Sequence, residues 1–412
     1  MTLTLCMIVK NEAARIGGCL DSVQSVADEI VVVDTGSTDQ TEQIARMRGA
    51  QVYAYEWQND FAAARNFALT KASQDWILVL DGDERLAPQA GAQLKRLLAG
   101  QTINGLSLET VLALNLIRQE VGANQSPYTL VARLFRNRAD ICFARPYHET
   151  IDQSVQAILA QEPSWRVVDW PQVALLHEGY TAEAIATQDK FNRAKTSLEG
   201  YLAHHPDDAY ICNKLGALYT QTGDWQRGSE LLQRGLAAVQ AANSEMEAMT
   251  LYELHYHLGL AQRQARALPE AMNHYQQAIA QPILAKLKLG AYLNLGAVHM
   301  AQKQVDAAIT CFRQATVIDS TFAIAFYNLG IAYRTKGYGY LEPAIAAYQQ
   351  AIALQPAYAA AYQNLGVALF KLGKLPESLQ AFQQAIALYE KTDPAAAAHL
   401  KQELKQLALP KQ

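Results

Sequence analysis

The stretch Trp76-Ile77-Leu78-Val79-Leu80-Asp81-Gly82-Asp83-Glu84 determines the fold that we expect for the first part of this chain. Its first five residues are all apolar, which is typical of a strand that is buried on both faces of a sheet. An acidic turn then ends the strand abruptly. Ligands of open parallel sheets bind beyond the carboxyl ends of the strands. The turn therefore lies where we expect a ligand to bind.

Upstream of this stretch the sequence alternates between strand-like and helix-like segments. Each expected strand is followed by an expected helix. Asn11 is expected to cap the N-terminus of the first helix, and Gly49 is expected to end the second. Units of this length predict a parallel sheet with helices on both faces. The expected strands are Leu3–Val9, Glu29–Val33 and Gln51–Tyr55, and the expected helices run from Asn11 to about Val26, from about Asp39 to Arg48, and over Asp60–Ala72.

From about Gly105 to His177 the pattern changes to strands and loops, and beyond Ala182 it is helical throughout. An internal repeat is present in this helical part, because a Leu-Gly pair recurs at intervals of 34 to 43 residues. The pairs are Leu215-Gly216, Leu258-Gly259, Leu295-Gly296, Leu329-Gly330 and Leu365-Gly366.

A second recurring set combines small residues with one aromatic residue, as in Ala308, Phe312 and Ala315. Small residues allow two helices to approach closely, and the aromatic side chain fills the groove between them. This pattern closely resembles the tetratricopeptide repeat. We predict about five repeats, with a leading helix over Gln188–His205, a closing helix over Pro394–Leu409, and an extended helix or loop around Ala241–Glu247.

Length and composition limit the possible classes of protein. The 412 residues suggest two or three domains, and 50% hydrophobic residues provide enough material for well-buried cores. A net charge of -4 argues against a nucleic-acid partner. No apolar run has the length of a transmembrane segment, no secretory signal is evident, and the five cysteines are scattered. We expect a cytoplasmic protein, with peripheral attachment at the inner face of the membrane as the alternative.

Four sequence blocks in order resemble the family-2 glycosyltransferases of the GT-A fold, over about residues 1–180. The resemblance implies a Rossmann-like, mostly parallel α/β domain at residues 1–182, followed by an all-α tetratricopeptide-repeat solenoid at 183–412. It also implies an inverting, hexosyltransferase-type enzyme that uses UDP-sugar or another nucleotide sugar. The blocks are Cys6-Met7-Ile8-Val9-Lys10-Asn11-Glu12, Val32-Val33-Asp34-Thr35-Gly36-Ser37-Thr38-Asp39, Ala64-Arg65-Asn66 and Leu80-Asp81-Gly82-Asp83-Glu84.

The acidic turn suits the chemistry of such a donor. Carboxylates at alternate positions after a strand can both reach one divalent cation, which prefers oxygen ligands. We predict Mg²⁺ or Mn²⁺ bound directly by Asp83, with Asp81 contacting the ribose or a metal-bound water. A bound metal acts as a Lewis acid on the departing diphosphate. Arg65 is expected to face the phosphates, because a guanidinium matches two oxygens at once.

The other donor contacts follow from the resemblance, which places Asp34 and Thr35 against the base or the ribose. Each turn taken alone is more simply an ordinary turn or helix cap, so the prediction rests on the four blocks together. Neither a GxxxxGK[ST] loop nor a GxGxxG after the first strand offers another phosphate site. The full set of predicted donor-binding residues is Ile8, Lys10, Glu12, Asp34, Thr35, Arg65, Asp81 and Gly82.

The catalytic base is assigned to the segment Arg145-Pro146-Tyr147-His148-Glu149, with Glu149 as the base and His148 as a neighbouring orienter. A structural or acceptor-binding role for this segment is the alternative. His177 is predicted either to complete the metal shell or to be an ordinary capped histidine. Arg133 and Arg136 either contact acceptor or phosphate, or belong to a solvated strand face.

The repeats leave three functional hypotheses open. In the first, a glycosyltransferase uses the concave groove of the solenoid to bind a protein or peptide acceptor, or a second copy of the chain as a homodimer. In the second, the enzyme builds a polysaccharide or lipid-linked glycan and its repeats serve assembly alone. In the third, the chain is a non-catalytic interaction scaffold with a vestigial sugar-nucleotide domain, although the presence of Asp34, Arg65, Asp81 and Asp83 argues against this.

Overall fold

The computed structural model describes residues 1–123, 125–178, 188–242 and 248–408. The chain divides into two compact units, Met1–Ala242 and Asn243–Gln412. The first unit therefore contains the sheet and also the first three helices of the helical region. The predicted domain boundary between residues 182 and 183 lies outside the described residues and stays a prediction.

Four strands of the first unit form the parallel part of the sheet, as predicted. They are β1 (Leu3–Val9), β2 (Glu29–Asp34), β3 (Gln51–Ala54) and β4 (Trp76–Val79). Their spatial order is β3-β2-β1-β4, and all three neighbouring pairs are parallel. The carboxyl ends of β1, β2 and β4 therefore meet at one edge of the sheet.

The other four strands make the complete sheet a mixed one, with the order β3-β2-β1-β4-β7-β6-β8-β5. Strand β7 runs antiparallel to β4 and to β6, whereas β8 runs parallel to β6 and antiparallel to β5. The end of β8 at His177 lies opposite Glu84 on one side and Glu120 on the other. The bounds are β5 (Glu84–Leu86), β6 (Val111–Glu120), β7 (Tyr128–Arg136) and β8 (Arg166–His177).

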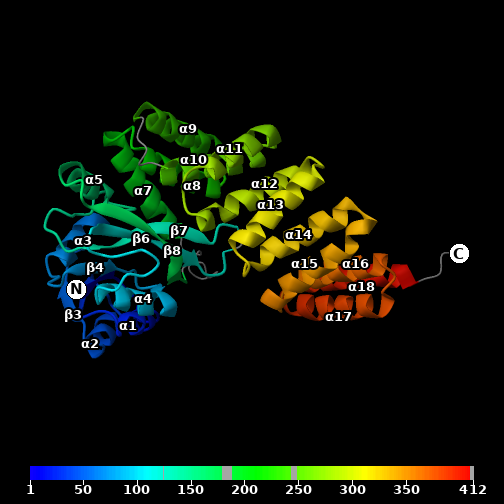
Figure 1. The fold of residues 1–412 in the computed structure, drawn as a ribbon, viewed down its shortest axis with the longest axis horizontal. Helices are drawn as coiled ribbons and strands as arrows, with labels where there is room; N and C mark the ends of the chain where they lie inside the picture. The colour runs from blue at the N-terminus through cyan, green and yellow to red at the C-terminus, as the bar shows by residue number, and fades with distance from the viewer. Residues whose placement is uncertain (124, 179–187, 243–247, 409–412) are drawn as a thin grey trace. The chain divides into compact units, whose positions relative to one another are not determined.

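Helices cover both faces of this sheet because successive strand residues point to opposite faces. In β1, Leu5 and Met7 pack into the core below α1 (Ile16–Val23), α2 (Thr41–Met47) and α4 (Pro88–Leu98). Cys6 packs instead into the core below α3 (Phe61–Leu69) and α5 (Asp152–Gln161). Figure 1 shows these two groups of helices on opposite sides of the sheet.

The start of the first helix differs from the prediction. Helix α1 begins at Ile16, and Asn11 has a positive φ of 56° that a helix start does not use. The side-chain oxygen of Asn11 accepts a hydrogen bond from the backbone N–H of Thr38 at 2.8 Å. Asn11 therefore joins the loop after β1 to the loop after β2. Asp60 does cap α3, since its carboxylate accepts from the N–H of Ala63 at 3.0 Å.

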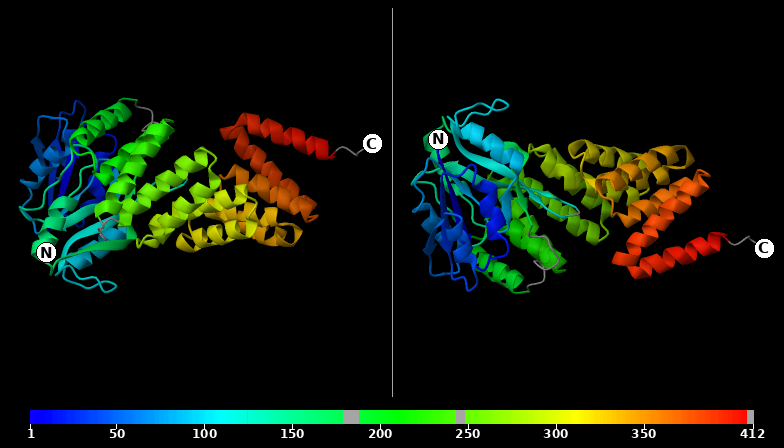
Figure 2. Two further views of the ribbon diagram at one scale, coloured as in Figure 1. Left: turned by 90° about the horizontal axis from the view of Figure 1, so that it is seen from above. Right: turned by 90° about the horizontal axis from the view of Figure 1, so that it is seen from below.

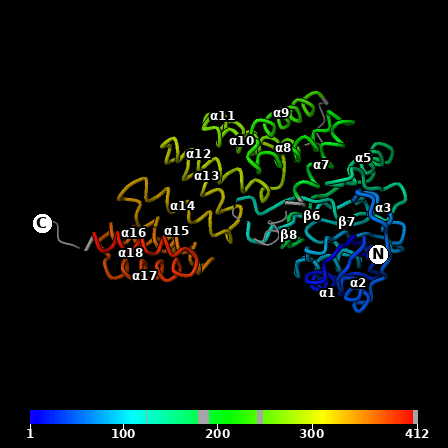
Figure 3. Tube along the Cα trace, turned by 180° about the vertical axis from the view of Figure 1, so that it is seen from behind, coloured from blue at the N-terminus to red at the C-terminus, as the bar shows by residue number. Residues whose placement is uncertain are grey.

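The helical region contains, within the described residues, five antiparallel helix pairs with a leading and a closing helix, which confirms the predicted repeats. Figures 2 and 3 show the helices of the second unit following one another in chain order, from α10 to the red α18. The predicted extension around Ala241–Glu247 lies largely outside the described residues, which resume at Ala248. None of the described helices combines the length and apolar composition needed to cross a membrane. The bounds are α7 (Gln188–His204), α8 (Ala209–Gln221), α9 (Trp225–Ala242), α10 (Ala248–Gln264), α11 (Leu268–Ala280), the 3-10 helix η2 (Ala285–Lys288), α12 (Leu289–Ala301), α13 (Val305–Ile318), α14 (Ala323–Lys336), the 3-10 helix η3 (Tyr338–Tyr340), α15 (Leu341–Leu354), α16 (Ala359–Lys371), α17 (Leu375–Thr392) and α18 (Pro394–Ala408).

The recurring glycines have the packing role that the sequence suggests. A Cβ atom added at Gly296 would lie 2.5 Å from the ring of Phe312, and one added at Gly330 would lie 2.5 Å from the ring of Tyr348. Such distances are far below van der Waals contact. In four of the five repeats the glycine of the Leu-Gly pair thus lets the two helices approach to the distance at which an aromatic ring fills the gap, whereas Gly216 of the first repeat lies against Leu232.

Candidate functional site

Asp34 ends β2 at the carboxyl edge of the parallel strands, opposite Val9 at the end of β1. Its Oδ1 accepts hydrogen bonds from the backbone N–H groups of Gly36 and Ser37 at 2.8 and 2.7 Å. Its Oδ2 is buried and has no hydrogen-bond partner within the described part of the chain. Since a buried carboxylate oxygen without a partner is costly, this oxygen is suited to accept a hydrogen bond from a ligand.

The acidic turn after β4 is held in shape by a buried carboxylate. The backbone N–H of Asp81 donates to Oε2 of Glu84 at 2.9 Å, and the fully buried Glu84 pairs with Arg118 at 2.9 Å. Gly82 is required for close approach, because an added Cβ would lie 2.8 Å from Cγ of Glu12. The turn is thus fixed by its own Glu84 and by a strand from elsewhere in the sheet.

Two arginines bind the carboxylate of Asp81. Nη2 of Arg65 lies 2.6 Å from Oδ1, and Nη2 of Arg133 lies 2.8 Å from Oδ2. Burial alone would raise the pKa of the Asp81 carboxyl, but the charges of Arg133 and Arg65 outweigh it and hold this pKa well below its usual value. Asp81 is therefore ionised, and both of its oxygens already have cationic partners.

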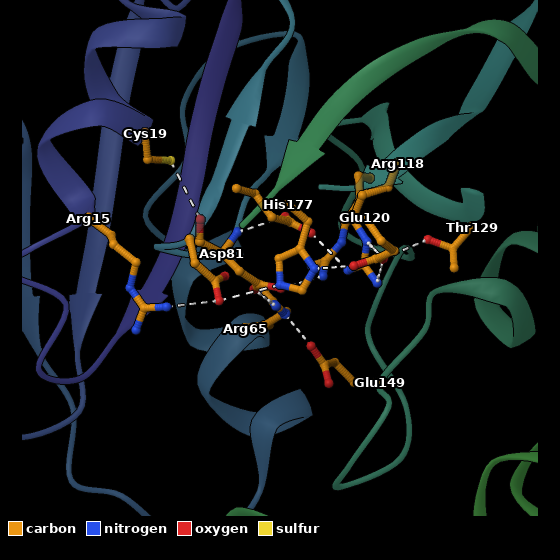
Figure 4. A network of polar contacts seen from close by, with 12 residues as sticks. Arg15, Cys19, Arg65, Asp81, Arg118, Glu120, Thr129, Glu149 and His177 are labelled. Atoms are coloured by element: carbon orange, nitrogen blue, oxygen red, sulfur yellow. Dashed lines mark hydrogen bonds and ion pairs between the residues drawn. The ribbon is translucent and has the colours of Figure 1, made fainter. Parts of the chain in front are cut away.

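Arg65 connects Asp81 to Glu149. The side chain of Arg65 is 4% exposed, and its Nε donates to the carboxylate of Glu149 (Figure 4). Its Nη1 is buried without a hydrogen-bond partner among the described residues. The structure thus brings together three predicted site residues, from the turn after β4, from α3 and from the loop after β7. A phosphate contact by Arg65 stays a prediction.

His177 bridges two carboxylates on the other side of the turn. Its Nε2 lies 3.4 Å from Oδ2 of Asp83, and its Nδ1 lies 2.5 Å from Oε2 of Glu120 (Figure 4). Burial alone would lower the pKa of the imidazole, yet hydrogen bonds to Asp83 and Glu120 raise it to about 9. The imidazole lowers the pKa of both carboxyls in turn, against the effect of burial.

These side chains bear directly on the predicted metal. The described residues contain no group of three or more His, Cys, Asp or Glu side chains arranged to hold a metal ion. Asp83 and His177 supply two potential ligands whose atoms already face one another. Mg²⁺ is commonly held by one or two protein ligands together with substrate phosphates and water. The residues present fit a cation that is shared with a bound diphosphate.

The remaining predicted residues lie around this centre. Thr35 is buried, and its hydroxyl donates to the carbonyl of Val9 at 3.1 Å. Ile8 is half-buried at the end of β1, whereas Lys10 after it is exposed. His148 is exposed and its ring lies against that of Tyr147, at 5.1 Å between centroids.

Several site residues were missed in the sequence. Glu120 and Arg118 reach the centre from β6, and Arg15 contacts Asp83 at 3.5 Å. A charged pair at alternate positions near the end of a strand that begins with a mostly apolar run was an available signal for the first two. Of the two arginines considered on β7, Arg133 joins the site, whereas Arg136 stacks on the ring of Trp76 at 4.7 Å and donates to backbone carbonyls.

Comparisons with known proteins agree with this architecture. The family described as Glycosyl transferase family 2 matches residues 4–104, that described as TPR repeat matches 296–337 and 339–373, and Tetratricopeptide repeat matches 359–391. A TPR repeat-containing protein of Synechococcus elongatus is 42% identical over 407 residues, which are 99% of this chain and 97% of that protein. An uncharacterized glycosyltransferase of Rickettsia bellii is 34% identical over 150 residues, 36% of this chain and 50% of that one. Among solved structures, YrrB, described as a TPR protein with an unusual peptide-binding site, has 17% identity and a TM-score of 0.41, and covers 51% of this chain and 100% of its own.

Proposed function

We propose a donor, a mechanism and an acceptor class on the premise that this chain belongs to the family of tetratricopeptide-repeat proteins with an N-terminal glycosyltransferase family 2 domain. Its activity is that of a glycosyltransferase. The donor in our proposal is a nucleotide sugar, with UDP as the first choice of nucleotide, and the transferred group is a hexosyl unit. The reaction inverts the configuration at the sugar carbon.

The proposal rests on three carboxylates at the carboxyl edge of the parallel strands, in the segments that follow β2 and β4, which lie on either side of β1. Asp34 lies at the end of β2, and its buried Oδ2 has no hydrogen-bond partner among the described residues. Asp81 and Asp83 lie in the turn after β4, which is two strands away in the sheet. Asp34 would accept a hydrogen bond from the base or the ribose. Arg65 and Arg133 fix Asp81 so that its position does not depend on the ligand.

Asp83 and His177 are the residues that would hold Mg²⁺ or Mn²⁺, with Glu120 fixing the orientation of the imidazole through Nδ1. When bound, the cation would neutralise the negative charge that develops on the departing diphosphate. Without it, the imidazole holds a proton between Asp83 and Glu120, since its pKa is raised to about 9. Metal binding therefore has to release this proton.

Glu149 is our candidate for the catalytic base. Its side chain is 10% exposed and is oriented by Nε of Arg65, which keeps the carboxylate within the same cluster as Asp81. A base in this place would take the proton of the acceptor hydroxyl as the sugar carbon is attacked. His148 would act beside it as an orienter, on the exposed side of the loop.

The acceptor in our proposal is a polypeptide that the helical repeats recruit, and self-association into a homodimer is the alternative role of the repeats. Stacked repeats form an extended surface on which a peptide can lie. The division of the chain supports this role, because all of the predicted donor-binding residues lie in the first unit and the second unit is left for another task.

Turnover of nucleotide sugars by the full-length protein tests the proposal. UDP-glucose, UDP-N-acetylglucosamine, UDP-galactose and GDP-mannose are incubated with Mn²⁺, and release of the nucleoside diphosphate is measured. We expect slow hydrolysis of at least one donor, its loss in EDTA, and its loss in Asp83→Asn. Absence of release from every donor, with Mn²⁺ and with Mg²⁺, would contradict the proposal. Asp224→Asn, far from the acidic turns in the sequence, serves as the control.

A further inference from the structure

The loop that carries Glu149 has two sides, and only one of them belongs to the donor site. A pair of backbone hydrogen bonds between Ala144 and Thr150, at 2.9 and 3.2 Å, closes residues 145–149 into a tight loop. We refer to it as the 145–149 loop. Glu149 contacts Arg65 on the donor side. On the other side, Arg145 contacts the start of α8, the first helix of the first repeat, and Tyr147 packs against the leading helix α7 and against α8.

Arg145 forms a nearly buried ion pair with the first repeat. Its Nε lies 2.9 Å from Oδ2 of Asp208, and the two side chains are 9% and 11% exposed. Its Nη1 donates to the hydroxyl of Thr150 at 2.9 Å, and its guanidinium lies 4.9 Å from the ring centre of Tyr210. A buried pair of this kind holds its position firmly, because separating the partners leaves an uncompensated charge.

Asp208 joins this loop to a helix start. While Oδ2 accepts from Arg145, Oδ1 accepts from the N–H of Ile211 at 3.0 Å and so caps α8. Tyr147 adds an apolar contact, because it packs against the cluster that Leu198 and Leu215 form between α7 and α8. One carboxylate and one ring therefore attach the loop to the repeat.

The backbone of the loop needs such support. Arg145 and His148 have positive φ values of 77° and 55°, which residues with a Cβ seldom adopt. Conformations of this kind persist only where the surroundings impose them. The N-terminus of α3 also depends on the loop, because the N–H of Phe61 donates to the carbonyl of Pro146 at 3.0 Å. Helix α3 in turn carries Arg65.

We infer that Asp208 is a positioning residue of the transferase site, which it serves by holding the 145–149 loop and with it Glu149. The first repeat is then a structural part of the catalytic unit rather than an appended binding module. The role of Glu149 in this inference rests on the proposed function. The attachment of the loop to α8 does not, and it can be measured separately.

The variant Asp208→Asn separates positioning from folding. Asparagine caps helices as well as aspartate does, so α8 keeps its cap while Arg145 loses its anionic partner. Asp224→Asn is the matched control, because Asp224 accepts from the N–H of Arg227 at 3.3 Å before α9 and has no contact with the loop among those observed. Hydrogen–deuterium exchange of peptides covering 144–150 should become faster in Asp208→Asn and stay unchanged in Asp224→Asn.

Activity provides the second measurement, on the donor that the wild type hydrolyses. Turnover by Asp208→Asn should fall about 10- to 100-fold, the effect of a displacement near 1 Å in a reacting group, while the Kd for UDP with Mn²⁺ stays within about twofold. Arg145→Met should have the same effect, and the double variant should be no worse than either single one.

Unchanged exchange in Asp208→Asn would overturn the inference, as would faster exchange with unchanged turnover. A wild type that hydrolyses no nucleotide sugar would count against the proposed function instead, since the exchange measurement requires no donor. An equal loss of turnover in Asp224→Asn would also overturn the inference, because it would show a general effect of weakened helices.

Discussion

In the proposed mechanism, the contact between Arg65 and Glu149 is the one that positions the catalytic base. Arg65 is buried, so its charge has to be matched within the protein, and Asp81 and Glu149 both do so. A carboxylate paired in this way is fixed in direction. A general base needs a fixed position and orientation of its carboxylate, because it has to lie within hydrogen-bond distance of the acceptor hydroxyl whose proton it takes.

Glu149→Gln should therefore bind the donor normally and lose transfer. The amide oxygen can still accept from Arg65, but it cannot take a proton, so we expect a decrease of about 100- to 10,000-fold in turnover. The measurement is the rate of transfer or donor hydrolysis at saturating donor, together with the Kd for UDP. Glu162→Gln is the control, since Glu162 also pairs with an arginine, Arg138 at 2.6 Å, without joining this cluster. Wild-type turnover in Glu149→Gln would exclude it as the base.

The sequence was informative about some of these residues and not about others. Asp34, Asp81 and Asp83 could be predicted because Asp34 ends one apolar strand and the other two lie in the turn after another, which places all three at the carboxyl edge of the sheet. Glu120 and Arg118 were not found, because their place depends on how β6 pairs with β8. That pairing contains register shifts, including one between Ile117 and Arg118, which no local pattern reveals.

At the scale of elements, the sequence predicts those strands and helices whose apolar residues recur at the spacing of a strand or of a helix. The parallel strands and the repeat helices are of this kind, since each buries a face that its own sequence marks. The mixed half of the sheet was anticipated only as strands and loops. Its order arises from contacts between segments far apart in the chain, as where β8 inserts between β5 and β6.

The close helix approach within a repeat can be tested at Gly296. Gly296→Ala should destabilise the second unit by about 1–3 kcal/mol, because the new methyl group would overlap the ring of Phe312. Gly200→Ala is the control, as nothing lies within 4 Å of its added Cβ and alanine favours a helix interior by roughly 0.5–1 kcal/mol. The measurement is thermal or urea unfolding of the full chain. Equal effects at the two positions would contradict the packing role of the Leu-Gly pair.

A pair of histidines should make the stability of the second unit depend on pH. Nδ1 of His255 on α10 lies 3.0 Å from Nδ1 of His274 on α11. Burial, and then the neighbouring imidazole, lower the pKa of His255 to about 4, below the usual value of 6.5. The neutral form is thus the one that the fold favours. Stability is complete above pH 6.5 and is lost as the pH falls toward 4.

We expect the free energy of unfolding of the second unit to fall by about 2 kcal/mol. This is less than the full pKa shift of His255 would give, because both rings are partly exposed to solvent. Unfolding of the second unit is followed at pH 7, 6 and 5 in the wild type and in His255→Gln. The variant should show a smaller decrease between pH 7 and 5. The same pH dependence in both proteins would mean that other groups are responsible.

At the scale of the whole molecule, the predicted donor-binding residues and the first repeat belong to one compact unit, Met1–Ala242. A chain that ends at Ala242 should therefore keep UDP binding with Mn²⁺, while transfer to a polypeptide acceptor should fall steeply if the later repeats recruit it. A chain that ends at residue 187 lacks Asp208 and should show weaker turnover per bound donor. Unchanged acceptor transfer by the 242-residue chain would exclude recruitment by the second unit.

The most direct measurement is calorimetric titration of UDP into the full-length protein, in Mn²⁺ and in EDTA, with Asp83→Asn in parallel. The site that Asp34, Asp81, Asp83 and His177 surround should bind UDP in Mn²⁺ and bind it at least about tenfold more weakly in EDTA, because two ligands and the diphosphate share the cation. Asp83→Asn should bind UDP with an affinity that no longer depends on Mn²⁺. Absence of binding by UDP and by GDP in Mn²⁺ and in Mg²⁺ would contradict a nucleotide-sugar site at this edge of the sheet.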